Sequence, residues 1–196
     1  MSGSFSRKLV KAMVKARFKV LAPTAFALTE VGEVFASSPD KLIKRTLWVN
    51  FFTLTGDISQ QHIKLLFQID KVEDGKAYTI FKGHDLTRDY LRSLIRRGCS
   101  KIDGIFDVLT KDGFLLRVTI MAITQKRVKS SQEKAIRKIM REVVEQKSAK
   151  LNFDEFVREM ILGKVASEAF NTAKKICPLR RVEVRKSKLL LKGEGK

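Results

Sequence analysis

Alternating apolar and polar positions predict strands in the first two thirds of the chain. The segment 44–55 (KRTLWVNFFTLT) is rich in β-branched and aromatic residues, which favours a strand. Segments 62–72 and 77–82 flank Asp74-Gly75, a pair typical of tight hairpin turns. A second hairpin is predicted over 105–124, with a Thr-Lys-Asp-Gly turn near its centre. Two such hairpins favour an antiparallel β-sheet or a small β-barrel built from hairpins.

Apolar residues at helical spacing predict a long amphipathic helix that begins near Ser130. Ser130 and Glu133 have the spacing of a capping box, in which side chains satisfy free backbone N–H groups. The apolar stripe consists of residues three and four apart: Ile136, Ile139, Met140, Val143 and Val144. Most basic side chains fall on the other side, so the helix has a cationic face.

Three further helices and a last strand complete the predicted elements. One helix is predicted over 87–97, a second after Asn152, and a third over roughly 164–176, ending before Pro178. The segment 181–191 alternates as a final strand. We therefore predict an α+β fold, in which the sheet or barrel is flanked by helices.

The charge balance indicates a polyanionic partner. The chain has 40 Lys and Arg residues against 21 Asp and Glu residues, a formal net charge of +19. The excess lies in residues 1–20, 125–150 and 174–196, whereas the signs are nearly balanced over 51–80. A surplus of this size is typical of nucleic-acid-binding proteins, and less often of proteins that bind anionic membranes.

We expect the clustered cations to contact RNA phosphates, since Arg binds phosphate through two N–H groups and Lys acts as a mobile point charge. The candidate RNA-binding residues are Arg7, Lys8, Lys11, Lys15, Arg17, Arg88, Arg92, Lys126, Arg127, Lys129, Lys134, Arg137, Lys138, Arg141, Arg180, Arg181, Arg185, Lys186 and Lys188. Phosphate binding of this kind weakens steeply as salt rises.

The length and composition fit a single folded domain with a basic extension. Of the 196 residues, 44% are hydrophobic and 13 are Phe, which excludes a wholly disordered chain. We predict a basic N-terminal arm over 1–19, one α+β RNA-binding domain over 20–192 and a tail over 193–196. No apolar run approaches the ~20 residues of a membrane span, and basic residues interrupt the N-terminus, unlike a signal peptide. Only two cysteines are present, so we expect a cytoplasmic protein without a membrane partner.

The residue types that usually perform catalysis or hold metals are sparse. His62, His84, Cys99 and Cys177 lie far apart in the sequence, without the close spacing of a metal site. His84-Asp85 could form a base with its orienting carboxylate, but no nucleophile motif accompanies the pair. We expect no cofactor, no metal and no small-molecule substrate. A hydrolase acting on acidic substrates remains a weak alternative.

Aromatic residues in the predicted strand at 44–55 allow two interpretations. Trp48, Phe51 and Phe52 could form a platform on which RNA bases stack. Because the neighbouring residues are apolar, we expect most of the three to lie in the core.

Five segments in chain order resemble the S-three-a (eS-one) family of archaeal and eukaryotic small-subunit ribosomal proteins. They are 18–23 (FKVLAP) with Phe26, 83–89 (GHDLTRD), 107–117 (DVLTKDGFLLR), Lys126-Arg127 with 136–142 (IRKIMRE), and 176–179 (ICPL) with 184–188 (VRKSK). The resemblance covers roughly 17–192. The short stretch 6–19, in place of a long Lys-rich extension, favours an archaeal-type member. Region 30–46 matches the family poorly and is expected to be a variable loop, and Gly98-Cys99 stands where many members have an aromatic residue.

The resemblance implies a non-catalytic structural protein, bound to the ribosome in the cytoplasm. It implies a place on the platform near the messenger exit, with small-subunit ribosomal RNA and neighbouring ribosomal proteins as partners and messenger RNA as a further one. It also implies a β-barrel-like sheet flanked by helices. The alternative is a free RNA-binding regulator or chaperone outside the ribosome, which composition alone does not exclude.

Overall fold

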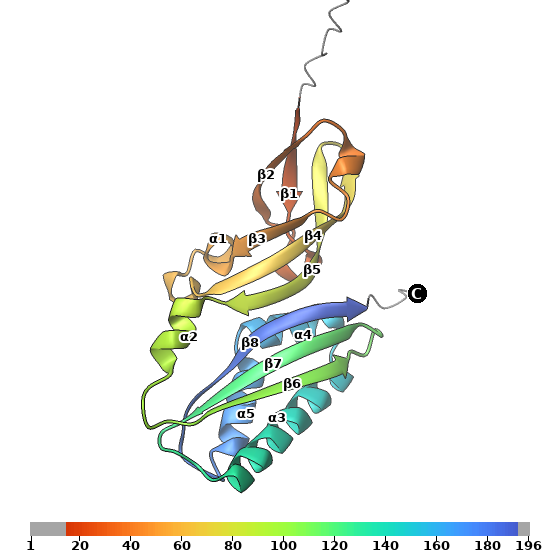
Figure 1. Cartoon of the computed structure of the whole chain (residues 1–196). Helices are drawn as coiled ribbons and strands as arrows, with labels where there is room; N and C mark the ends of the chain where they lie inside the picture. The colour runs from red at the N-terminus through yellow and green to blue at the C-terminus, as the bar shows by residue number, and fades with distance from the viewer. Residues whose placement is uncertain (1–14, 192–196) are drawn as a thin grey trace, which may run out of the picture.

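Two long hairpins and a C-terminal strand form most of the sheet in the computed structural model, which describes residues 15–191 (Figure 1). The elements of the first lobe are β1 (Ala16–Leu21), η1 (Thr24–Phe26), β2 (Glu30–Ala36), η2 (Pro39–Lys41), β3 (Thr46–Asn50), α1 (Phe51–Thr55), η3 (Ile58–Gln60), β4 (Ile63–Glu73) and β5 (Lys76–Leu86). The elements that follow are α2 (Arg88–Leu94), β6 (Lys101–Leu109), β7 (Leu115–Thr124), α3 (Ser130–Lys150), α4 (Phe153–Ile161), α5 (Lys164–Ala173) and β8 (Leu179–Leu191).

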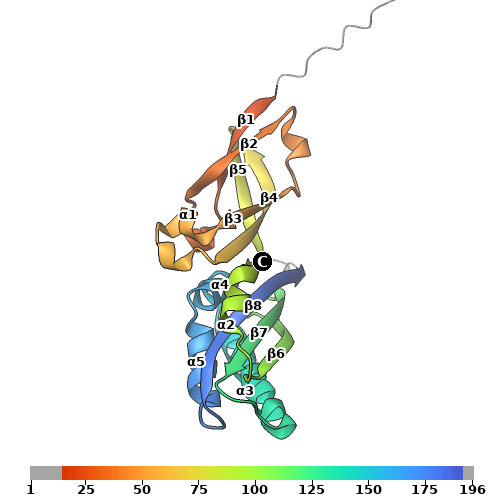
Figure 2. The same cartoon turned by 60° about the vertical axis from the view of Figure 1, so that its left-hand side comes forward.

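The eight strands form one open sheet. Its order is β2-β1-β5-β8-β7-β6, and β4 pairs with both β5 and β3. The sheet is mixed because β1 runs parallel to β5, while the other pairs are antiparallel. The predicted α+β class with flanking helices is therefore confirmed, with an open sheet rather than a closed barrel. Figure 2 shows the two lobes, β1–β5 and β6–β8 with their helices, stacked end to end.

Both predicted hairpins are present, and backbone geometry explains their turns. Asp74 and Gly75 both have positive φ, 46° and 75°, as a two-residue turn between twisted strands requires. In the second hairpin, Gly113 has a φ of 79°, and the N–H of Thr110 donates to the carbonyl of Phe114 at 3.0 Å. The two turns set the register of β4 with β5 and of β6 with β7.

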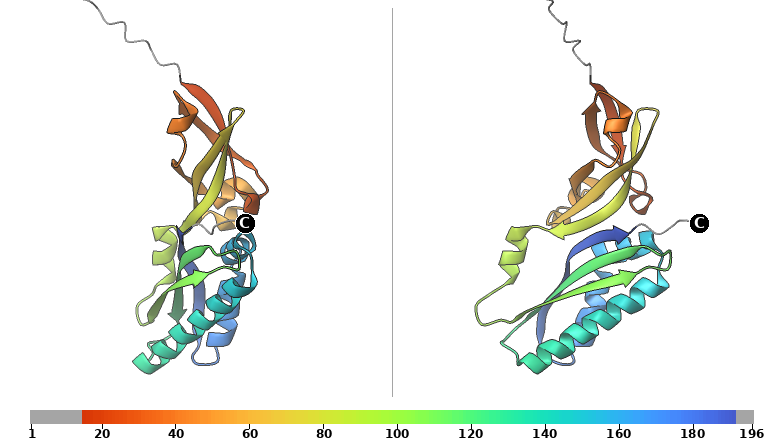
Figure 3. Two further views of the ribbon diagram at one scale, coloured as in Figure 1. Left: turned by 90° about the vertical axis from the view of Figure 1, so that its right-hand side faces the viewer. Right: turned by 45° about the vertical axis from the view of Figure 1, so that its right-hand side comes forward.

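Helices cover the two faces of the second lobe unequally. The apolar stripe of α3 packs with α4 and α5 on one face, where Ile136, Met140 and Phe156 are fully buried. On the opposite face α2 contributes Leu94, which packs against Met121 and Ile123 of β7. Figure 3 shows α2 and the other helices on opposite sides of β6–β8. We call the α3 side the inner face and the α2 side the outer face.

The two lobes meet where β5 crosses β8. Only three residue pairs join these strands: Gly83–Lys188, His84–Ser187 and Asp85–Lys186. A Cβ atom on Gly83 would lie 2.3 Å from the carbonyl oxygen of Ser187, so only glycine allows this approach. The main hydrophobic core nevertheless extends across the junction, because Phe81 of β5 and Phe153 of α4 belong to the same buried cluster.

Three segments in the first half differ from their predicted structure. The strand predicted over 44–55 ends at Asn50, and the rest forms α1, which ends when Gly56 adopts a left-handed φ of 73°. The variable loop predicted over 30–46 contains strand β2, which pairs with β1. Residues 16–19 of the predicted arm belong to β1, whereas residues 1–14 lie outside the described part.

The helix ends also differ slightly from prediction. The helix predicted over 87–97 ends at Leu94, because Ile95 turns to an extended conformation. The helix predicted to be capped at Ser130 starts one residue earlier, with Lys129 as N-cap; Gln132, rather than Glu133, accepts the N–H of Lys129 at 3.1 Å. None of the helices within 15–191 has the length and apolar character needed to cross a bilayer.

The junction provides a test of stability. Gly83→Ala is expected to lower the free energy of unfolding by roughly 2–3 kcal/mol, because the new methyl group forces β5 and β8 apart. Gly163→Ala is the control, because its Cβ meets no atom within 4 Å and only its φ of 77° is unfavourable. That variant should lose about 1 kcal/mol. Urea denaturation measures both, and equal losses would contradict the role assigned to Gly83.

Candidate nucleic-acid interface

Three arginines from two distant segments converge on the outer face. Arg88 and Arg92 lie one turn apart on α2, and Arg185 lies on β8. With Lys101 they surround a recess of about 230 Å³, and its apolar lining consists of Leu91, Ile95 and Met121. We refer to Arg88, Arg92 and Arg185 as the arginine cluster.

Local structure explains why these side chains meet. The second helix begins after Thr87, and its Tyr90 anchors it by stacking on the His62 ring, with centroids 3.9 Å apart. The Tyr90 hydroxyl donates to Glu183 at 3.2 Å, and burial raises the pKa of Tyr90 to about 12. A register shift between β7 and β8 leaves Arg185 without an opposite residue. Anchoring of α2 and this irregularity in β8 bring the cluster together.

The arginine cluster has no carboxylate partner among residues 15–191. Neighbouring cations on β8 differ, because Arg181 pairs with Glu183 at 2.6 Å and Lys186 with Asp85 at 3.3 Å. Like charges at Arg88 and Arg92, four residues apart on a helix, repel each other. An anion bound at the recess would relieve this repulsion.

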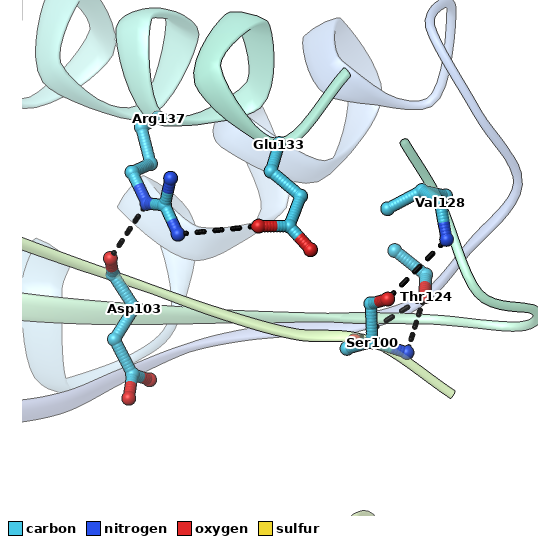
Figure 4. A network of polar contacts seen from close by, with 6 residues as sticks. All are labelled: Ser100, Asp103, Thr124, Val128, Glu133 and Arg137. Atoms are coloured by element: carbon cyan, nitrogen blue, oxygen red, sulfur yellow. Dashed lines mark hydrogen bonds and ion pairs between the residues drawn. The ribbon is translucent and has the colours of Figure 1, made fainter. Parts of the chain in front are cut away.

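The basic face of α3 is largely neutralised by its own glutamates. The pairs, each between residues four apart, are Arg137–Glu133 at 3.4 Å, Lys138–Glu142 at 3.9 Å and Arg141–Glu145 at 4.0 Å. Arg137 also donates to the backbone carbonyl of Asp103 at 3.2 Å, as Figure 4 shows. Lys134 is exposed and has no such partner among the described residues. Three of the candidate residues on α3 are therefore engaged within the protein.

The other candidate residues are spread over several surfaces. Lys126, Arg127 and Lys129 are exposed between β7 and α3, and a network around Ser100 holds the start of this loop (Figure 4). Lys186 and Lys188 lie on the outer face, and Arg17 lies at the start of β1 with Lys15 just before it. Arg180 and Arg181 lie beside a recess of about 630 Å³. Arg7, Lys8 and Lys11 fall outside the described residues. The fold thus places α2 and α3 cations on opposite faces, and they do not form one surface.

Most of the three aromatic residues at 48–52 were expected in the core, but only one of them is buried. Trp48 is 57% exposed and Phe52 is 39% exposed, whereas Phe51 is 4% exposed. Strand register places Trp48 in one row across the sheet with Lys188 and Arg117, on the outer face. The alternation within 46–50 could have predicted that Trp48 is exposed, because neighbouring residues of a strand face opposite sides and Val49 faces the core.

His84 is a buried part of the junction. The side chain is 2% exposed; its Nδ1 lies 2.6 Å from Ser187 Oγ and its Nε2 lies 3.1 Å from the carbonyl oxygen of Val184. Burial lowers the pKa of His84 to about 4, so the ring is neutral at pH 7. Within 15–191 no three potential ligands of a metal ion lie together. The geometry assigns His84 to packing of the junction.

The neutral state of His84 predicts a pH dependence of stability. The unfolded histidine takes up a proton near its ordinary pKa of 6.5, whereas the folded one stays neutral down to about 4. The free energy of unfolding should therefore fall by roughly 3 kcal/mol as the pH is lowered from 7 to 4. Urea denaturation at several pH values measures this. In His84→Gln, which cannot titrate, the free energy of unfolding should fall less between pH 7 and pH 4. The same pH profile in this variant as in the unaltered protein would contradict the assignment.

Comparison with known proteins gives a consistent result. The model of the ribosomal S3Ae family matches residues 6–193. The small ribosomal subunit protein eS1 of Desulfurococcus amylolyticus is 51% identical over 178 residues, covering 91% of this chain and 84% of the relative. The eS1 proteins of Aeropyrum pernix and Methanothrix thermoacetophila are 50% and 44% identical, covering 90% and 94% of this chain and 85% and 87% of their own lengths. The resemblance stated from five short segments is therefore confirmed over nearly the whole sequence, and the chain belongs to the ribosomal S3Ae family.

Proposed function

We propose that this protein is a structural constituent of the small ribosomal subunit that binds ribosomal RNA through phosphate contacts. Membership of the ribosomal S3Ae family supports the ribosomal role, and the relatives compared are all named as small-subunit proteins. The proposed location is the platform near the messenger exit, in the cytoplasm, beside messenger RNA and neighbouring ribosomal proteins. The protein performs no catalysis in this role.

The arginine cluster is the observation that carries the RNA-binding proposal. Arg88, Arg92 and Arg185 present guanidinium groups without carboxylate partners in the described part, beside an apolar recess. A guanidinium group binds two phosphate oxygens at once, so an RNA backbone can neutralise the cluster. Phosphate contacts of this kind fix the position of the RNA without reading its sequence.

The rest of the outer face extends this surface. Lys188 is exposed on β8, and Trp48 lies in the same row of the sheet, while Lys186 is exposed beside them but paired with Asp85. Cations bind the RNA backbone, and an exposed indole ring can stack on an unpaired base. We propose that this face binds shaped, partly single-stranded RNA. Lys134, the loop cations at 126–129 and the N-terminal cations Arg7, Lys8 and Lys11 add further phosphate contacts.

The contrast between free and paired cations gives a specific prediction. The triple variant Arg88→Ala, Arg92→Ala, Arg185→Ala should weaken binding to purified small-subunit RNA. The slope of log K against log salt should become shallower by roughly 2, because about three phosphate contacts are lost. Filter binding at several salt concentrations measures both effects.

The matched control removes three charges from α3. The variant Arg137→Ala, Lys138→Ala, Arg141→Ala changes the net charge equally, but these cations pair with carboxylates in the free protein. We expect a smaller loss of affinity and a slope change below about 1. Equal effects of the two variants would show that net charge, rather than the arginine cluster, determines binding.

Sedimentation separates a ribosomal constituent from a free regulator or chaperone. A ribosomal constituent should sediment with the small subunit at physiological salt, and the triple variant of the arginine cluster should shift toward the top of the gradient. A regulator would remain near the top in both forms, and that result would contradict the ribosomal proposal.

A further inference from the structure

Strand β6 is an edge of the sheet, and apart from the Asp103 carbonyl its outward backbone groups have no bond to the described residues. The bond from Thr110 to Phe114 closes the β6–β7 hairpin, and in an antiparallel pair every second residue then directs its N–H and C=O away from the partner. By this alternation the backbone N–H and C=O groups of Asp103, Ile105 and Asp107 point away from β7. The bond between the Asp103 carbonyl and Arg137 Nε agrees with this assignment (Figure 4). No other described residue bonds to this edge.

The side chains along the edge do little to protect it. Edge strands usually carry charges that discourage pairing with another chain. Here Lys101 neutralises Asp103 at 2.7 Å, and Arg117 neutralises Asp107 at 2.7 Å. Between and beyond these ion pairs Ile105 is 63% exposed and Leu109 is 58% exposed. The edge therefore combines unpaired backbone groups with two exposed apolar side chains, Ile105 and Leu109.

A recess lies beside the edge, next to the position that an added strand would take. It has a volume of about 390 Å³ and is lined by Ile105, Phe106, Asp107, Arg117, Arg141 and Glu145. On its α3 side the recess is lined by Arg141 and Glu145, whose side chains form an ion pair at 4.0 Å, close to the upper limit for such a pair. A carboxylate on an incoming chain could compete for Arg141.

We propose that β6 binds an extended segment of another protein, which adds to the sheet as a ninth strand. Its backbone would bond to Ile105 and Asp107, its apolar side chains would cover Ile105 and Leu109, and an acidic side chain would face Arg141. Strand addition of this kind takes affinity from the backbone and specificity from alternate side chains. The proposed site is the edge of β6, which adjoins the arginine cluster at Lys101 but is formed by other residues. The proposal does not rest on the RNA-binding proposal.

The charges favour an acidic protein segment over the other occupants. A second copy of this chain carries the same net charge of +19, so pairing edge to edge would bring two strongly basic chains together. RNA lacks the alternating donors and acceptors that match a strand edge. Because β6 has nine residues, against seven in β2 and five in β3, it is also the longest of the free edges in the described sheet.

A synthetic peptide tests the proposal on the full-length protein. The probe alternates valine and glutamate over about ten residues, the length of a typical strand. Addition of the peptide should slow amide hydrogen exchange of Ile105 and Asp107 at least tenfold, as measured by NMR. The same peptide with alternate backbone nitrogens methylated should have no effect, because it cannot form the ladder.

Substitutions at the edge provide the matched comparison. Ile105→Pro removes an N–H that β7 does not use, so the hairpin should fold and peptide binding should weaken at least tenfold. Ile105→Glu should act similarly by charge, whereas Thr119→Glu, on the same face but one strand inward, should change affinity less than twofold. The proposal is wrong if the peptide slows no β6 amide, or if both glutamate variants weaken binding equally. Protection of the same amides by an RNA oligonucleotide or by self-association would also overturn it.

Discussion

The close contact between β5 and β8 is the constraint on which the rest of the structure depends. Three residue pairs join the lobes there, and Gly83 permits a close approach of the two strands that any side chain would prevent. His84 bonds to Ser187 within the same junction, and Asp85 pairs with Lys186 at its surface. Because the junction holds two hairpins in one sheet, it also aligns their outer faces. A protein with separate lobes would not place Trp48 in a row with cations of β8.

The sheet separates two surfaces with different chemistry. Its inner face is covered by α3, α4 and α5, so the core and the neutralised helix surface lie on that side. Among the described helices, only α2 lies on the outer face of the second lobe, which leaves β-strand side chains exposed to a partner. The proposed RNA contacts centre on α2 and β8, whereas the proposed protein contact lies along the edge strand β6.

Net charge predicts the class of partner, but ion pairs decide which cations are available. The +19 surplus indicated a polyanion, and α3 had the densest basic pattern. In the folded protein three of its cations pair with glutamates four residues away, while the arginine cluster has no such partners within 15–191. A free guanidinium can bind phosphate without first releasing a carboxylate, which is why we propose the cluster as the stronger site.

The sequence by itself determined the elements that short-range bonds define. Asp74-Gly75 predicted its hairpin because the turn needs two positive φ values, and the stripe on α3 predicted its buried face. The five family segments also identified the family. Tertiary structure alone decided the break after Asn50, the exposure of Trp48 and the meeting of Arg185 with α2, nearly a hundred residues earlier in the chain. These features depend on packing and pairing between distant segments, because local propensity does not specify which strand or helix a side chain will meet.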